Sequence, residues 1–113
     1  MSDASKPLVW LEGRISTPPF SRAARLEAGF LLRLLQEGEH LRLPQSRPMP
    51  AIGERCHELR IQDASATWRI IYRLEVDAVV ILGAFSKKGR KTPRSVMDAC
   101  RDRLRLWERA NEE

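Results

Sequence analysis

Three strand-like segments in the second half of the chain, joined by very short turns, constrain the fold more than any other feature. Residues 57–61 alternate between polar and apolar side chains, and residues 67–74 are rich in β-branched and aromatic residues. Residues 78–85 form a nearly continuous apolar run, as expected for a strand buried on both faces. Because turns of three to five residues join strands that lie side by side, the pattern predicts an antiparallel meander.

A long amphipathic helix is predicted ahead of these strands. From about Pro19 to Glu37 the apolar residues recur with helical spacing. They are Ala24, Ala28, Leu31 and Leu35, with Phe30 and Leu34 beside them. Ser16 and Thr17 are candidate caps for its start, and Gly38 favours its end because glycine readily adopts the left-handed conformation there.

The remaining segments complete an α+β pattern. Residues 8–11 predict a short first strand, and residues 39–55 predict a proline-rich connector anchored by Leu41, Leu43, Met49 and Ile52. Thr92 and Pro93 begin a last helix with Val96, Cys100, Leu104 and Trp107 on its apolar side. We therefore expect one domain over residues 1–113, an antiparallel sheet of about four strands with an N-terminal helix region and a C-terminal helix packed on it. Its ends, about residues 1–6 and 110–113, are expected to be flexible.

Positive charge is concentrated in the second half of the chain. Lys and Arg number 20 against 15 Asp and Glu, and residues 55–109 alone hold 13 basic and 7 acidic residues. Residues 78–97 contain no acidic residue but carry Lys87, Lys88, Arg90, Lys91 and Arg94. Like charges repel one another unless a polyanion compensates them, so the partner is expected to be a nucleic acid or an acidic protein. A solvated basic loop without a specific partner is the alternative.

Several classes of protein are excluded by simple patterns. No apolar run of about 18 residues is present, and the first residues lack the apolar segment of a signal peptide, so we expect a cytoplasmic protein without a membrane span. Cys56, Cys100, His40 and His57 do not have the spacing of a structural zinc site. No glycine-rich phosphate loop and no Ser-His-Asp order is present. We therefore expect neither a metal nor a cofactor.

Strand alternation brings basic side chains together. Arg69 and Arg73 share one face of their strand, and Arg60 on the preceding strand approaches Arg69 if the hairpin has ordinary register. Lys87 and Lys88 follow the next strand directly. Two arginines and two lysines that converge in this way would bind a phosphate without a metal.

A purely structural explanation of the same residues stays open. In that case Arg60 pairs with Glu58 or another nearby acid, and Arg69 pairs with Glu75. Tyr72 lies on the strand face opposite Arg69, which favours a place in the core.

Four segments in succession resemble a known family. They are His57-Glu58-Leu59-Arg60, Trp68-Arg69-Ile70-Ile71-Tyr72, Leu82-Gly83-Ala84-Phe85-Ser86-Lys87-Lys88 and Lys91-Thr92-Pro93. In this order and spacing they resemble the motifs of RelE/ParE-superfamily toxins, in particular the HigB-like, phage-related subgroup. The resemblance spans about residues 8–107.

The resemblance implies a RelE-like fold and the role of toxin in a toxin–antitoxin pair. The antitoxin would carry a helix-turn-helix domain. The activity would be metal-independent cleavage of mRNA on the ribosome, by attack of a ribose 2′-hydroxyl on the adjacent phosphate. The alternative within the same superfamily is a ParE-type inhibitor of DNA gyrase that catalyses no reaction.

The resemblance also implies roles for individual residues. Arg60 and Arg69 would hold the scissile phosphate, while Lys87 and Lys88 would add charge and one of them would move a proton. Arg73, Arg90, Lys91 and Arg94 would bind the RNA. No residue is assigned as the general base.

Overall fold

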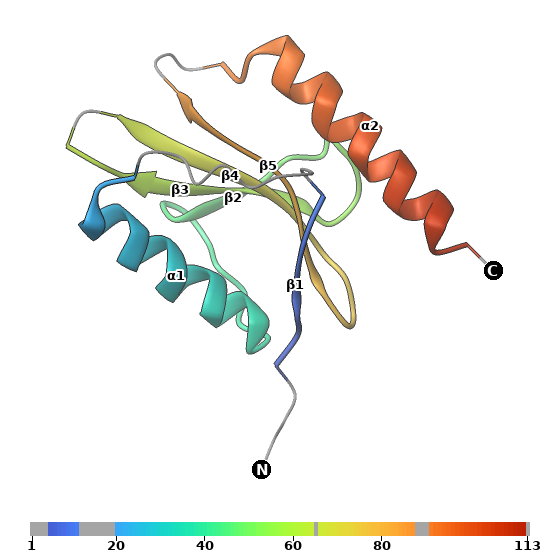
Figure 1. Ribbon diagram of the computed structural model, residues 1–113, viewed down its shortest axis with the longest axis horizontal. Helices are drawn as coiled ribbons and strands as arrows, with labels where there is room; N and C mark the ends of the chain where they lie inside the picture. Colours follow the sequence, from blue (N-terminus) through green and yellow to red (C-terminus); the bar gives the residue numbers. More distant parts are fainter. Residues whose placement is uncertain (1–4, 12–19, 65, 88–90, 113) are drawn as a thin grey trace.

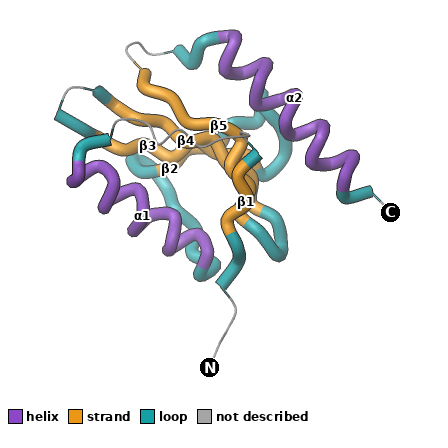
Figure 2. The backbone as a smooth tube through the Cα atoms, in the orientation of Figure 1, coloured by secondary structure: helices purple, strands orange, loops and turns teal. Residues whose placement is uncertain are grey.

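Three long antiparallel strands form the centre of the molecule, and helices cover both faces of their sheet (Figure 1). The computed structural model describes residues 5–11, 20–64, 66–87 and 91–112. The elements are, in chain order, β1 (Leu8–Trp10), α1 (Arg22–Gln36), β2 (Ser46–Pro48), β3 (Cys56–Gln62), β4 (Thr67–Leu74), β5 (Val79–Lys87) and α2 (Arg94–Ala110). Figure 2 shows the strands as one layer between α1 and α2. The predicted α+β class and the two helices are confirmed.

The predicted meander is confirmed as β3–β4–β5, but the sheet around it differs from the prediction. It has five strands, in the order β1-β5-β4-β3-β2. β1 pairs in parallel with β5, with Leu8 opposite Val79, so the sheet is mixed rather than antiparallel. β2, which lies in the predicted connector, adds a fifth strand antiparallel to β3. The sheet therefore has one strand more than the expected number of about four, and one of its edge strands is parallel rather than antiparallel.

Helix α1 covers one face of the sheet with the predicted apolar stripe. Ser21 caps it by accepting the N–H of Ala24 at 3.0 Å, while the predicted caps Ser16 and Thr17 lie outside the described residues. Gly38 follows the helix with φ of +92°, as predicted. Phe30, however, is 60% exposed, because Leu32 rather than Phe30 turns toward the sheet.

The two core clusters lie on opposite faces of the same strands. The α1 side buries Leu59, Ile61, Trp68, Ile70, Tyr72, Val79 and Ile81. The α2 side buries Met49, Ile52, Cys56, Ile71, Val80, Leu82, Cys100 and Leu104. Met49 and Ile52 thus anchor the connector as predicted, whereas Leu43 is 65% exposed and does not. Tyr72 belongs to the core, and its hydroxyl shares a hydrogen bond of 2.6 Å with that of Ser46.

Candidate functional site

The candidate site lies on the α2 side of the sheet, where three strands place Arg60, Arg69 and Phe85 in one row. Arg60 of β3 is directly opposite Arg69 of β4, which confirms the expected hairpin register. Arg69 is in turn opposite Phe85 of β5. Directly opposite residues lie about 5 Å apart and share a face. The fold therefore places two guanidinium-bearing residues and an aromatic ring side by side.

A buried carboxylate organises this row. Glu58, one alternation before Arg60 on β3, has no exposed surface. Its Oε1 accepts a hydrogen bond from Nε of Arg47 at 3.1 Å and another from Nη1 of Arg69 at 3.5 Å. Its Oε2 accepts one from the Thr92 hydroxyl at 3.4 Å. Glu58 thus links β2, β4 and the segment before α2, and it holds the Arg69 guanidinium in one place.

Arg60 is not neutralised in this way. Its side chain donates no hydrogen bond to another described residue, and its Nε is buried without a partner among them. The alternative pairing predicted from the sequence, Arg60 with Glu58 and Arg69 with Glu75, is therefore not the observed one. Glu58 instead pairs with Arg69 and Arg47, so Arg60 has no carboxylate partner among the described residues, and its outer nitrogens Nη1 and Nη2 are neither buried nor hydrogen-bonded to them.

The local electrostatics favour an anion. Burial lowers the pKa of Arg69, the Glu58 carboxylate raises it, and the charges of Arg60 and Arg47 lower it again, so the pKa lies below its ordinary value. The guanidinium groups of Arg47 and Arg69 share one carboxylate here, and the charge of Arg60 is close enough to act on Arg69. A bound phosphate would supply the missing negative charge and accept hydrogen bonds from the arginine donors.

Arg73, predicted to bind RNA, serves the packing of α2. It is 6% exposed, and its Nη1 donates to Glu108 of α2 at 2.5 Å. Its Nε lies 3.6 Å from Glu75. Burial lowers the pKa of Arg73, but the hydrogen bond to Glu108 and the charges of Glu75 and Glu108 outweigh it and raise the pKa. Arg73 thus joins β4 to the last turns of α2.

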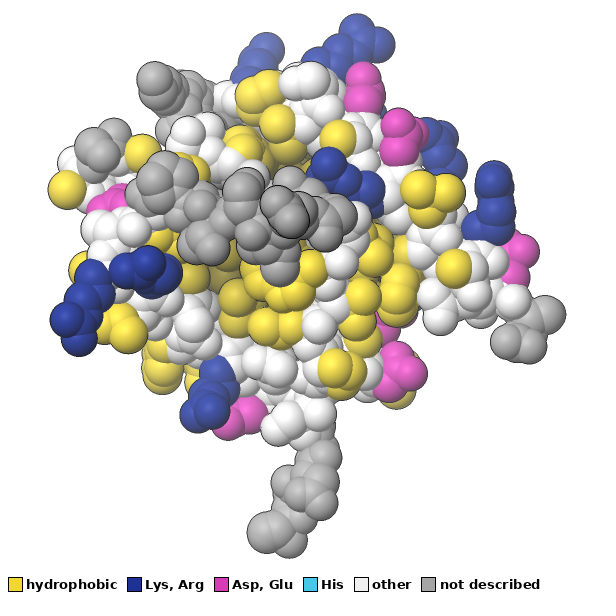
Figure 3. All heavy atoms as spheres, viewed as in Figure 1, with side chains coloured by type: hydrophobic (Ala, Val, Ile, Leu, Met, Phe, Trp, Pro, Cys, Tyr) yellow, Lys and Arg dark blue, Asp and Glu magenta, His cyan; other side chains and the backbone are white. Residues whose placement is uncertain are grey.

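Only part of the predicted basic loop can be located. Lys91 and Arg94 are exposed, and Arg94 is the first residue of α2. Lys87 ends β5 opposite Thr67, but its side chain lies outside the described part of the structure, as do Lys88 and Arg90. Figure 3 shows one face of the molecule, on which Lys and Arg side chains are spread over both helices.

Sequence reasoning missed three contributors to the site. Arg47 lies on β2, which has no strand signature, and Thr92 was taken only as a helix cap. Arg103 of α2 donates from Nη1 to the carbonyl oxygen of Leu82 at 2.7 Å. The available signal was Glu58 itself: an acid that alternates with apolar residues of a buried strand must find cationic partners.

Burial shifts the pKa of three other titratable groups near the sheet toward their neutral forms. Burial raises the pKa of the Cys56 thiol to about 11 and also raises that of Tyr72, and burial lowers the pKa of His57. His57 stacks on Tyr72 with ring centroids 5.4 Å apart, on the α1 side of the sheet. In the described part of the chain, no group of three or more His, Cys, Asp and Glu side chains is placed to hold a metal ion. Neither described helix is long and apolar enough to cross a membrane.

Comparison with known proteins identifies the family. A search of curated proteins found no match to the chain. The family described as phage derived protein Gp49-like (DUF891) matches residues 19–105, which include α1, the β3–β4–β5 meander and most of α2. This match covers well over half of the chain. The chain therefore belongs to the phage-derived Gp49-like family, which is a family of RelE-like toxins.

Proposed function

We propose that this protein is the toxin of a toxin–antitoxin pair and a metal-independent, ribosome-dependent mRNA endonuclease of the HigB-like type. Membership in a family of RelE-like toxins implies an antitoxin partner, and we propose that the antitoxin carries a helix-turn-helix domain. The single observation that supports endonuclease activity is the Arg60–Arg69 pair, in which Glu58 neutralises Arg69 while Arg60 has no carboxylate partner among the described residues.

The two arginines would have different tasks. Arg69 is fixed by Glu58 and 6% exposed, so it provides a preorganised positive charge under the scissile phosphate. Arg60 is half-buried and free to donate hydrogen bonds to the phosphate oxygens. Preorganised donors stabilise the charge that develops in a transition state without having to rearrange. The pair is thus suited to the pentacoordinate phosphorus of a cleaving RNA.

The reaction would be an internal transfer. The ribose 2′-oxygen attacks the adjacent phosphorus and loses its proton, the bond from phosphorus to the 5′-oxygen breaks, and that oxygen gains a proton. The products are a 2′,3′-cyclic phosphate and a free 5′-hydroxyl. We propose that Lys87 and Lys88, at the end of β5, add positive charge and that one of them moves a proton.

The remaining basic residues would follow the RNA backbone. Lys91 and Arg94 are exposed between β5 and the first turn of α2, and Arg90 lies in the same segment of the sequence. Contacts of this kind contribute affinity that falls as the salt concentration rises. Arg73 is buried against Glu108 and would act on the RNA only indirectly, by holding α2 in position.

Primer extension on transcripts after induced expression tests the proposal. Wild-type protein should produce defined new 5′ ends and stop translation. Arg60→Ala and Lys87→Ala should each reduce cleavage by about 10²–10³-fold, the usual effect of removing one donor to a transition state. Arg105→Ala is the matched control, because Arg105 is exposed on α2 and pairs with Asp102, and it should cleave like the wild type.

Loss of DNA synthesis with intact mRNA would contradict this proposal and support the gyrase inhibitor. In that case toxicity would survive Arg60→Ala, and purified gyrase would be retained by the immobilised protein. Both assays use the full chain, and the toxicity assay compares it with Arg60→Ala.

A further inference from the structure

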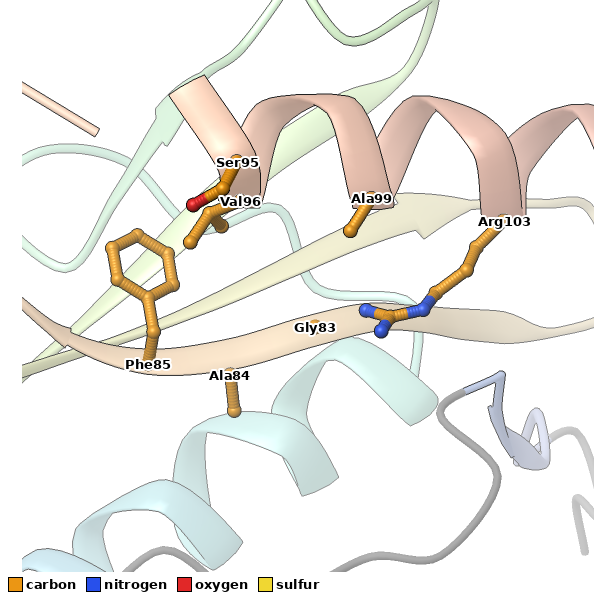
Figure 4. Close-up of a pocket in the computed structure, with 7 residues that line it drawn as sticks. All are labelled: Gly83, Ala84, Phe85, Ser95, Val96, Ala99 and Arg103. Carbon is orange, nitrogen blue, oxygen red and sulfur yellow. The ribbon is translucent and has the colours of Figure 1, made fainter. Parts of the chain in front are cut away.

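A hollow between β5 and α2 adjoins the proposed phosphate site. It has a volume of about 160 Å³. Its walls include Gly83 and Phe85 of β5 and Ser95, Val96, Ala99 and Arg103 of α2. Figure 4 shows the Phe85 ring at one end and the Arg103 guanidinium at the other, while Ala84 points to the opposite face of the sheet. Phe85 is also the residue opposite Arg69, so the hollow begins where the row of Arg60 and Arg69 ends.

The size and walls of the hollow suit one flat ring system. Pockets for drug-sized ligands enclose roughly 300–1,000 Å³. The hollow, at about 160 Å³, has room only for a smaller group. Ala99 keeps its middle open because its side chain is a single methyl group, while Gly83 leaves room for the Arg103 guanidinium, whose Nη1 would lie 3.2 Å from a Cβ at that position. An aromatic wall such as Phe85 favours a base over a phosphate, because every base has a face that stacks.

Arg103 gives the hollow a polar end that is not neutralised. Arg101 and Arg105 on the same helix each pair with an acid three residues before them. Arg103 has no carboxylate partner among the described residues, and its one hydrogen bond to them goes to the Leu82 carbonyl. Its other N–H groups therefore remain available at the end of the hollow shown in Figure 4.

The contact to Leu82 also has a structural explanation, which the experiment must separate from ligand binding. The register of β4 and β5 shifts between Ile71 and Tyr72, so Leu82 is the extra residue of a bulge. Its carbonyl oxygen, in this irregular part of the ladder, accepts from Arg103. A guanidinium has five N–H donors, so one bond to Leu82 leaves enough to form a second, bidentate contact.

We propose that this hollow binds a guanine base next to the scissile phosphate and that Arg103 determines the preference for guanine. The inference rests on the proposed cleavage of RNA. Guanine presents two neighbouring acceptors, O6 and N7, which match the fork of an arginine, whereas adenine presents N7 beside an amino donor. Neighbouring strands lie about 4.8 Å apart, so Phe85 is about 10 Å from Arg60 across the row, within the reach of one nucleotide.

Binding of single nucleotides tests the hollow without any cleavage. Guanosine 3′-monophosphate, titrated into the full chain, should shift the amide NMR signals of Gly83 and Ala99. Its affinity should exceed that of adenosine 3′-monophosphate about tenfold, the lower part of the discrimination expected from one arginine–guanine pair. Ala99→Leu fills the hollow and should abolish these shifts. Ala23→Leu, the same change at an exposed position of α1 on the other side of the sheet, should leave them unchanged.

Arg103→Lys separates recognition from structure. Lysine can still donate to the Leu82 carbonyl, so the fold should be kept, but it has no fork for two acceptors. The variant should therefore bind both nucleotides equally. Equal affinity of the wild type for the two nucleotides, or binding unaffected by Ala99→Leu, would overturn the inference.

Mapping of cleavage sites distinguishes this inference from the proposed function. Wild-type sites should share a guanine at one fixed position beside the cut, and Ala99→Leu should remove that preference. Cleavage by the wild type without any base preference would overturn the guanine site and leave the endonuclease proposal intact. Selective binding of guanosine 3′-monophosphate without cleavage would support the site and contradict the endonuclease.

Discussion

The two faces of the sheet are made by alternate residues of the same strands, and both bury apolar side chains, but only the α2 side also buries charged ones. On the α1 side, Leu59 and Ile70 are buried among apolar side chains. On the α2 side, their immediate neighbours Glu58 and Arg69 are buried as charged groups. Both faces exclude water, but the second holds its buried charges in pairs that join different strands and α2. The α1 side is thus a purely apolar core, whereas the α2 side combines an apolar core with buried ion pairs.

The energetic basis of the two faces differs accordingly. Burial of an apolar side chain stabilises the fold by about 1.5–3 kcal/mol. A buried ion pair contributes little net stability, but loss of one partner is costly because it leaves an unpaired charge in the interior. The α2 side is therefore the more sensitive face to the loss of a single acid, even though its charges are not what holds the sheet together.

The largest expected effect follows from Glu58→Ala. This change leaves Arg69 buried without its carboxylate and removes the acceptor for Arg47 and Thr92. The free energy of unfolding should fall by about 3–5 kcal/mol, measured by urea denaturation. Glu54→Ala is the control: Glu54 is exposed and 4.0 Å from Arg55, so its loss should cost less than about 1 kcal/mol. Similar losses for the two variants would contradict the role assigned to Glu58.

A somewhat smaller effect is expected from Leu59→Ala on the α1 side. Leu59 has no exposed surface, and its truncation should lower the free energy of unfolding by about 3 kcal/mol. Cleavage per folded molecule should stay at the wild-type level, because the α2 side is unchanged. Arg60→Ala should have the opposite pair of effects. It should change the free energy of unfolding by less than about 1 kcal/mol, but the folded variant should lose cleavage. If Leu59→Ala also abolished cleavage by folded protein, the two faces would not be independent.

The smallest expected effect is a pH dependence at the start of α1. Asp63 follows β3 and accepts the backbone N–H of Ser21 at 3.0 Å and Nε1 of Trp68 at 3.2 Å. The N–H of Ser21 is the main cause that lowers the pKa of Asp63 from 3.8 to about 2. Because the folded state favours the ionised carboxylate, its stabilising effect is present above about pH 4. It should be lost as the pH falls toward 2.

An NMR titration of the Asp63 carboxyl group checks this directly. Amide protection of Ala24, in the first turn of α1, should fall over the same pH range. In Asp63→Asn that part of the pH dependence should disappear. An ordinary titration near pH 3.8 in the wild type would contradict the contact between Asp63 and α1.

Much of the fold could be predicted because local patterns were strong. The alternation in β3, the apolar run of β5 and the helical spacing in α1 each identify their element from nearby residues alone. β2 could not be predicted, since it is three residues long, ends in Pro48 and pairs only because β3 lies beside it. Phe30 and Leu43 were assigned to the core by hydrophobicity, but tertiary packing left both exposed.

Part of the candidate site could also be predicted, because it too depends on a local pattern. Hairpin register follows from a short turn, so Arg60 and Arg69 could be placed opposite each other from the sequence. The hydrogen-bond partners of Glu58 could not be predicted from the sequence, because Arg47 and Thr92 approach it from segments 11 and 34 residues away. The hollow beside Phe85 depends on how α2 crosses β5, which no local pattern specifies.

By itself, the sequence determined the α+β class, the central meander, the two helices and the position of the paired arginines, because all of these follow from short-range periodicity. Only the tertiary structure decided that β1 runs parallel to β5, that Glu58 neutralises Arg69 rather than Arg60, and that Arg103 reaches the hollow between β5 and α2. Such contacts join residues far apart in the chain. Their energies depend on burial and geometry that exist only once the sheet and both helices have packed together.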